Sequence, residues 1–162
     1  MITQSKLMEL LTYDPETGEF RWRVARNRQI PNSIAGNLRR DGYRRIRIDR
    51  KTYGAHRLAW LYTHGKWPTD QIDHINMIKN DNRLCNLREA TNAQNMHNTR
   101  KICTNTSGVK GVTWNKLNKK WYSQIKINRK QIHIGQFDEL SDAAAAYERA
   151  AKTHFGEFAR VA

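Results

Sequence analysis

The chain has 162 residues, of which 38% are hydrophobic and 9% aromatic. This length suits one sizeable domain or two small ones, and the composition excludes an intrinsically disordered chain. The 29 Lys and Arg residues outnumber the 15 Asp and Glu residues, and the resulting formal net charge of +14 favours nucleic acid as the partner. No apolar run approaches the ~20 residues of a membrane-spanning helix, and no signal peptide opens the chain, so we expect a cytoplasmic protein.

The first part of the chain predicts short helices and strands. A leucine-bearing helical face near the N-terminus is followed by the turn sequence DPETG and the strand EFRWRV. Further on, Ile46 and Ile48 alternate with arginines, which predicts a hairpin with one apolar and one basic face and a turn near residues 49–51. Its second strand is expected to return as far as His56. The segment HRLAWLYTHG then predicts a helix that ends at Gly65.

The stretch QIDHINMIKNDNRLCNLREATNAQNMHN, residues 71–98, predicts a strand, a turn-rich loop, a second strand and a helix. Thr91 is a suitable N-cap for this helix, which is expected to run to about Arg100. These elements form a ββα unit at the end of a predicted domain over residues 1–100. The following residues 101–108 show no hydrophobic period and are expected to be a linker.

Residues 109–162 predict a second small domain. Three strand candidates, GVKGVTWNK, KWYSQIKIN and KQIHIGQF, precede the helical sequence SDAAAAYERAAKTHF. Ser141 is expected to cap this helix and Gly156 to end it. The predicted fold class is therefore α+β: N-terminal strands and a ββα unit, followed by a three-stranded antiparallel sheet with one packed helix.

The ββα segment carries the residue types that phosphodiester hydrolysis needs, a base and a cation-binding site. Asp73 offers a hard oxygen ligand, and His74 offers a base that works near neutral pH. Asn95 offers a second oxygen ligand, and Asn86 is placed to accept a hydrogen bond that fixes the imidazole tautomer. Two oxygen ligands suit Mg²⁺ or Mn²⁺ better than Zn²⁺. In a regular strand Asp73 and His74 point to opposite faces, so both serve one site only if the strand ends or bends there.

The spacing of these residues resembles the HNH endonuclease family, in the form common in bacteriophage and intron-encoded enzymes. In that pattern Asp-His is followed by eleven residues, Asn-Leu, seven residues and Asn, and this chain meets it. The resemblance covers about residues 5–100 and implies that His74 is the general base, that Asp73 and Asn95 hold the metal, and that Asn86 positions the base. Asn95 stands where other branches have His, which favours Mg²⁺. The expected location is then a bacterial or phage-infected cell.

The C-terminal segment resembles the plant ethylene-response-factor DNA-binding domain, of the APETALA type, through KGVTW, IGQF, AAAAYERAA and GEFA. The resemblance implies that the sheet lays one face in the major groove of double-stranded DNA while the helix packs on the other. Lysine stands at several positions where the plant family has arginine, and lysine cannot form the bidentate hydrogen bonds that arginine makes to guanine. We therefore expect more backbone gripping and less base reading than in the plant domain.

The expected DNA-binding residues are basic, amide or aromatic side chains, most of them on the predicted strands. They are Arg44, Arg45, Arg47, Arg50, Arg88, Lys110, Trp114, Lys116, Trp121, Lys126, Arg129, Gln131 and His133. Lys110 and Trp114 are assigned to the first strand of the C-terminal sheet. Core packing explains Trp114 and Trp121 as well as DNA contact does, and an ion pair with Asp81 or Glu89 is the alternative for Arg88.

Together these features predict a metal-dependent DNA endonuclease, a site-preferring nickase of the homing type. One ββα unit supplies one base and one metal site, which suffices for one strand, and the net charge of +14 disfavours self-association, so we expect a monomer. The alternative is a non-catalytic, sequence-specific DNA-binding regulator with an inactive nuclease unit. The presence of all four expected site residues favours the endonuclease. For His56, a structural role is favoured over a catalytic one.

Overall fold

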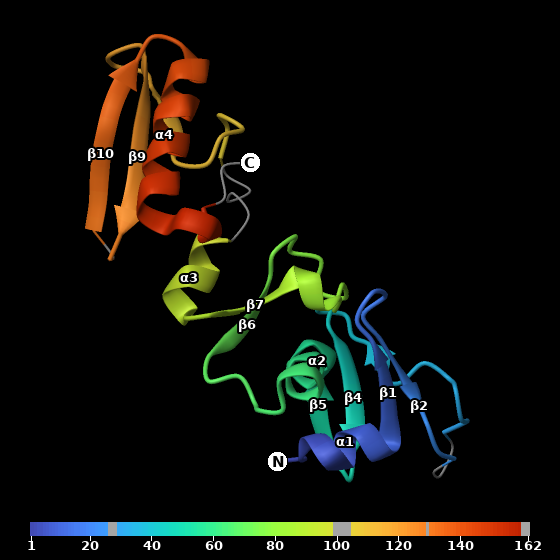
Figure 1. Cartoon of the computed structure of the whole chain (residues 1–162). Helices are drawn as coiled ribbons and strands as arrows, with labels where there is room; N and C mark the ends of the chain where they lie inside the picture. The colour runs from blue at the N-terminus through green and yellow to red at the C-terminus, as the bar shows by residue number, and fades with distance from the viewer. Residues whose placement is uncertain (26–28, 99–104, 129, 160–162) are drawn as a thin grey trace. The chain divides into compact units, whose positions relative to one another are not determined.

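The computed structural model describes residues 1–25, 29–98, 105–128 and 130–159. The chain divides into two compact units, Met1–Asn92 and Ala93–Ala162, and each is described by itself (Figure 1). Arg129 and the first half of the predicted linker, residues 101–104, lie outside the described residues. No helix in the described ranges is both long and apolar enough to cross a membrane.

The first unit contains short helices and three small antiparallel sheets, of order β1–β2, β3–β4–β5 and β6–β7. Its elements are α1 (Gln4–Leu10), β1 (Leu11–Asp14), β2 (Glu19–Trp22), β3 (Asn37–Leu38), β4 (Arg44–Ile48), β5 (Lys51–Gly54), α2 (Ala55–His64), β6 (Gln71–His74), the 3-10 turn η1 (Leu84–Asn86) and β7 (Leu87–Ala90). The helix α3 (Asn92–His97) begins at the last residue of this unit.

The hairpin of β4 and β5 has the two faces that the sequence predicts. Ile46 and Ile48 are buried in the core, whereas Arg45 and Arg47, which alternate with them, are exposed. The helix α2 packs against both strands and ends, as predicted, at Gly65, whose φ of 74° is left-handed. The apolar face of the hairpin is thus covered, and its basic face is left to solvent.

Two boundaries in this unit differ from the prediction. The leucine face near the N-terminus does not stay helical: α1 ends at Leu10, and Leu11 opens strand β1, which pairs with β2. A helix this short gains little from its own hydrogen bonds, and the β-favouring Thr12 and Tyr13 gain a strand partner instead. The second hairpin strand ends at Gly54, so His56 lies on α2 rather than on a strand.

The predicted order of strand, loop, strand and helix is confirmed for the ββα segment. Strand β6 pairs with β7, and α3 starts directly after Thr91. The helix is described to His97, and its predicted end near Arg100 lies outside the described residues. Asn86 belongs to η1, just before β7, and not to the strand itself.

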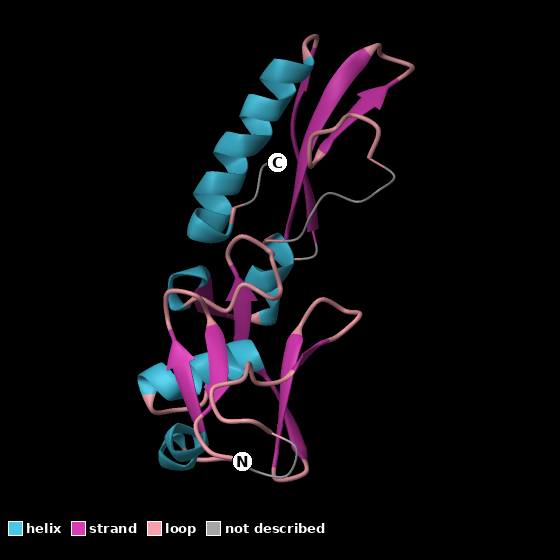
Figure 2. Cartoon of the chain, turned by 90° about the vertical axis from the view of Figure 1, so that its right-hand side faces the viewer, coloured by secondary structure: helices cyan, strands magenta, loops and turns pink. Residues whose placement is uncertain are grey.

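The second unit is a three-stranded antiparallel sheet with one helix, as predicted. Its elements are β8 (Val112–Asn115), β9 (Lys120–Ile127), β10 (Lys130–Phe137), α4 (Leu140–Phe155) and the 3-10 turn η2 (Gly156–Phe158). The sheet order is β10–β9–β8, and α4 runs alongside it (Figure 2). Alanines of α4 and Tyr147 pack with Val112 and Ile125 in a separate core.

Two local assignments in this unit are wrong. Lys110 lies in the turn ahead of β8, not on the first strand, because Gly111 takes a left-handed φ of 73°. The helix α4 begins at Leu140, so its N-cap is Glu139, and Ser141 is already inside the first turn. Glu139 makes no side-chain capping hydrogen bond.

The turn of the β1–β2 hairpin packs directly on the loop that precedes η1. Gly18 has a φ of +74°, and a Cβ at this position would lie 2.5 Å from the backbone of both Asn82 and Arg83. The hydroxyl of Tyr13 donates a hydrogen bond to the carbonyl oxygen of Asn82 at 2.8 Å. Burial raises the pKa of this hydroxyl, so it stays protonated as a donor.

We expect Gly18→Ala to destabilise the first unit by about 1–3 kcal/mol more than Gly65→Ala, because only the former forces backbone atoms apart. Gly65 has the same φ of +74°, but its nearest neighbour is the flexible end of the Gln4 side chain at 3.3 Å. Both variants therefore share the left-handed penalty of about 1–2 kcal/mol. Urea unfolding followed by tryptophan fluorescence measures the difference, and equal losses would contradict the close packing.

Candidate active site

Two buried polar residues lie at the end of strand β6. Asp73 and His74 are each 5% exposed, and they stand opposite Arg88 and Leu87 of β7 in the strand register. Polar groups are rarely buried in proteins without hydrogen-bond partners. The partners of these two side chains therefore define the site.

The carboxylate of Asp73 is held by Arg88. The Nε and Nη2 atoms of Arg88 donate to the same oxygen, Oδ2, at 3.0 and 2.9 Å, and both side chains are nearly buried. The alternative considered for Arg88, an ion pair with Asp81 or Glu89, is wrong. Asp81 pairs with Arg83 at 2.6 Å, and Glu89 accepts the backbone N–H groups of Thr69 and Asp70, just before β6. Cross-strand register, not sequence proximity, selects the partner of Arg88.

The imidazole of His74 contacts Asn82. The distance from His74 Nε2 to Asn82 Oδ1 is 3.3 Å, and Asn82 is 1% exposed. The other end of this amide, Nδ2, donates to the carbonyl of Asn80 at 3.2 Å, which fixes the orientation of the Asn82 side chain. Because an amide oxygen only accepts, the neutral His74 ring carries its proton on Nε2 and its lone pair on Nδ1.

Asn86 holds the loop rather than the ring. Its Oδ1 accepts the backbone N–H of Asn76 at 3.0 Å, and its Nδ2 donates to the carbonyl of Asp81 at 2.8 Å. The expected hydrogen bond from His74 to Asn86 is therefore corrected, since Asn82 stands in that place. The sequence does not single out Asn82, because this residue is one of several turn-forming asparagines in the same run and nothing in the pattern separates it from the others.

Two aromatic rings pack around the His74 ring. The ring centroid of His74 lies 5.9 Å from that of Tyr43 and 5.2 Å from that of His56, and Lys79 Nζ lies 4.9 Å from the Tyr43 centroid. Burial lowers the pKa of His56 to about 4. Burial also lowers the pKa of His74, while its contact with Asn82 and the charge of Asp73 act in the opposite direction. Both rings are thus neutral at pH 7, which leaves His74 in its basic form.

Comparisons with known proteins point to one family. The model of a family described as HNH endonuclease matches residues 53–97. The chain is also 33% identical over 106 residues to Protein 3.8 of Escherichia phage T7, a match that covers 65% of this chain and 87% of that protein. The chain belongs to the HNH endonuclease family. No solved structure matches it significantly.

The HNH match includes strands β6 and β7 and the loop between them, and so it contains Asp73, His74, Asn82 and Arg88. The HNH resemblance expected from the Asp-His spacing is confirmed. The match ends at residue 97 and does not reach the sheet of the second unit.

The donors expected to hold a metal are a carboxylate and an amide. Asp73 lies in the first unit, and Asn95 lies on α3 within the second. Among the residues that the structure describes, no three His, Cys, Asp or Glu side chains are grouped so as to hold a metal ion. Both expected donors are oxygen atoms, the donor type that Mg²⁺ and Mn²⁺ prefer in proteins. The ion pair with Arg88 holds the Asp73 carboxylate in one orientation.

The arginines expected on the N-terminal strands divide into two groups. Arg45, Arg47 and Arg50 are exposed. Arg44 is half-buried, and its Nη1 donates to the carbonyl of Gly36 at 3.0 Å, so it braces β3 against β4. The alternation along β4 therefore directs Arg45 and Arg47, but not Arg44, toward solvent.

The expected DNA-binding residues of the second unit also differ in exposure. Lys116, Lys126, Gln131 and His133 are exposed, and Lys110 is half-buried. Trp121 packs against the core formed with α4. Trp114 is 41% exposed and lies with its ring 4.9 Å from that of Trp121. Because Trp114 is two residues from buried Val112, it shares the helix-facing side of the strand, which favours packing over DNA contact for both tryptophans.

We expect the free energy of unfolding to fall as the pH drops from about 6.5 toward 4. The folded pKa of His56, about 4, lies below its unfolded value of about 6.5. The unfolded chain therefore binds a proton that the folded chain excludes, and the stability present above pH 6.5 is lost as the pH falls. His74 acts in the same direction. The His56 contribution is at most about 3 kcal/mol, at 1.36 kcal/mol per pKa unit.

Urea unfolding of the wild type and of His56→Phe at several pH values between 4 and 7 measures this loss. The variant fills a similar space without titrating, so its stability should depend less on pH, whereas a control change at exposed His64 (His64→Gln) should leave the wild-type dependence intact. An unchanged pH dependence in His56→Phe would show that His56 is not held neutral by the fold.

Proposed function

We propose that the chain is a divalent-metal-dependent DNA endonuclease of the site-preferring, homing type that nicks one strand as a monomer, with His74 as the general base. The observation that carries this proposal is the buried His74 ring, whose tautomer is set by Asn82, within the region that matches the HNH endonuclease family. A neutral imidazole held in this way presents a lone pair that can accept a proton.

The base is prepared in three ways by the residues around it. The contact of Nε2 with Asn82 leaves the lone pair on Nδ1, which takes the proton of the attacking water. The rings of Tyr43 and His56 keep the imidazole from rotating and exclude water from its flanks. Burial disfavours the imidazolium, so the ring returns its proton readily after the step.

Asp73 and Asn95 would hold a Mg²⁺ or Mn²⁺ ion, which when bound supplies positive charge beside the scissile phosphate. Arg88 fixes the carboxylate of Asp73. Removing Arg88 would leave that carboxylate without its oriented partner, so Arg88 supports the metal site in this proposal in addition to any phosphate contact.

The second unit serves as the DNA-binding module in this proposal, as its resemblance to the ethylene-response-factor domain implies. The polar face of its sheet, opposite α4, carries Lys126, Gln131 and His133. Side chains of these types on a three-stranded ribbon suit the major groove of double-stranded DNA. Lysine and amide groups there would grip the backbone more than they read guanine.

We expect His74→Ala to lower the cleavage rate by about 10²-fold or more, the size of a general-base contribution, while DNA affinity changes little. Supercoiled plasmid incubated with Mg²⁺ should accumulate as nicked circles with the wild type and with a His64→Ala control. The reaction should stop in excess EDTA. Cleavage by His74→Ala at the wild-type rate would remove the base assignment, and linear product without a nicked precursor would remove the single-strand proposal.

Asn82→Asp should move the acidic limb of the pH–rate profile to higher pH. A carboxylate beside Nε2 stabilises the imidazolium and raises the pKa of His74, so a higher pH is needed to free the base. Asn82→Ala should lower kcat with little change in KM, because it frees the ring without touching the DNA. The control is Asn80→Ala, since Asn80 contributes its backbone carbonyl. If the pH profile of Asn82→Asp matches the wild type, Asn82 has a structural role alone.

A further inference from the structure

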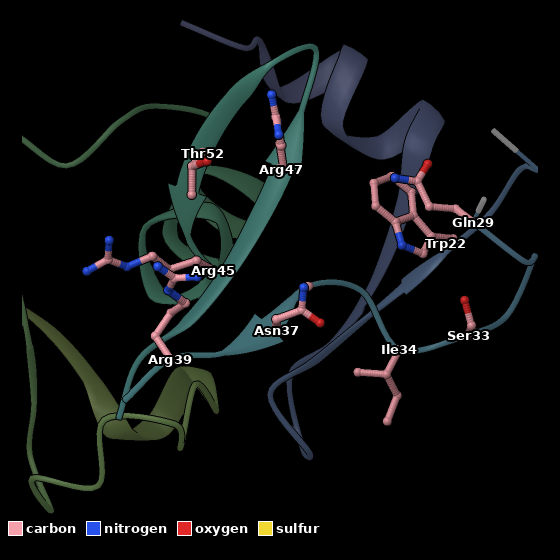
Figure 3. Close-up of a pocket in the computed structure, with 10 residues that line it drawn as sticks. Trp22, Gln29, Ser33, Ile34, Asn37, Arg39, Arg45, Arg47 and Thr52 are labelled. Carbon is pink, nitrogen blue, oxygen red and sulfur yellow. The ribbon is translucent and has the colours of Figure 1, made fainter. Parts of the chain in front are cut away.

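A hollow of about 670 Å³ lies on the basic face of the β3–β4–β5 sheet (Figure 3). Arg45 and Arg47 of β4 form one wall, and Trp22 and Ile34 lie on the other side. Arg39 also lines a second, neighbouring hollow of about 500 Å³. Of the described residues that line the larger hollow, none is acidic.

The two hollows adjoin, because Arg39 and Arg45 line both, and together they are called the arginine-lined trough. The smaller hollow adds Arg40 and a single acidic residue, Asp41. Asp41 is already paired with Arg45 at 2.6 Å. The trough therefore keeps a positive charge after its internal ion pair is counted.

Arg39 and Arg47 supply most of this charge. Both are exposed, and within the described part of the chain the structure records no ion pair and no side-chain hydrogen bond for either. Like charges placed along one wall repel one another, so the arrangement stabilises the fold in no evident way. It fits an anionic ligand that is long enough to meet several guanidinium groups.

The trough leads toward the candidate active site of the same unit. The loop that carries Arg39 and Asp41 continues into Tyr43, whose ring lies 5.9 Å from that of His74. Lys79 ties the two regions together, since its Nζ donates to the carbonyl of Asp41 at 3.1 Å and lies over the Tyr43 ring. A polymer lying in the trough would thus extend toward the base.

We infer that the trough binds the sugar–phosphate backbone of the DNA strand that leads to the scissile bond. This inference rests on the proposed endonuclease function and adds the type of contact. The phosphates are the ridges of a duplex, whereas base edges lie inside its grooves and are reached by projecting elements. Guanidinium groups that line a concave surface match the ridge. The trough therefore supplies affinity and register but reads no sequence.

The test compares two double variants in the full chain, each carrying His74→Ala so that the probe is not cut. Arg39→Gln with Arg47→Gln removes two charges from the trough. Lys66→Gln with Arg149→Gln removes two charges from exposed positions outside it. Fluorescence anisotropy with a labelled duplex of arbitrary sequence, titrated over a range of salt concentrations, gives the affinity and its salt dependence.

Losing two phosphate contacts should make the slope of log K against log salt shallower by about 1.8. When the salt rises from about 0.05 to 0.2 M, the affinity of the wild type should therefore fall by a factor about ten times larger than that of the trough variant. The control should keep the wild-type slope. The variant with Arg39→Lys and Arg47→Lys retains both charges and should have nearly the wild-type slope. This rescue distinguishes a loss of charge from misfolding.

Equal slopes in the trough variant and the wild type would overturn the inference. The inference would also be overturned if the trough variant lost affinity only for one preferred sequence and kept its affinity for arbitrary DNA, because that result indicates contacts with the bases. Cleavage by the chain with intact His74 is scored separately. A chain that binds through the trough yet never cuts with Mg²⁺ or Mn²⁺ refutes the proposed function, and one that cuts with an unchanged slope in the trough variant refutes the trough.

Discussion

The contact between His74 Nε2 and Asn82 Oδ1 is the constraint on which the candidate active site depends. A buried imidazole needs a fixed partner, because an unsatisfied ring nitrogen costs free energy and a rotating ring has no defined lone pair. The chain meets this need by immobilising a loop. Asn86 binds that loop from within, through Asn76 and Asp81. The β1–β2 hairpin binds it from outside, through Tyr13 and the close approach at Gly18.

The ion pair of Asp73 and Arg88 serves a different purpose. Taking two charges out of water is costly, and a buried pair often adds little to stability. What it provides is a carboxylate in one orientation beside an imidazole that stays neutral. The adjacent residues on β6 thus differ in their electrostatics, because Asp73 forms an ion pair whereas burial, which lowers the pKa of His74, leaves that ring uncharged at neutral pH. Arg88, the cross-strand neighbour on β7, orients Asp73, and Asn82 in the loop orients His74.

Much of this was predictable from the sequence, because spacing and alternation carry the information. Alternating Ile46 and Ile48 gave the two-faced hairpin, and the Asp-His spacing gave the ββα segment and the family. The rest depends on long-range register. The partner of Arg88 is set by strand pairing, and Asn82 is selected from equivalent asparagines by packing against a distant hairpin. The DNA-binding roles and the domain limits stay predictions.

The hydrogen bond from Tyr13 to the loop of Asn82 also bears on where a chain of this family can be divided. The family match begins at residue 53, yet the partner of the histidine is held by a hydroxyl from the first strand of the chain. A segment excised at the edge of the match would retain Asp73 and His74 but lose the brace that sets the ring. The smallest transplantable cassette therefore begins near the N-terminus, and grafts of the shorter motif onto other scaffolds need a substitute brace.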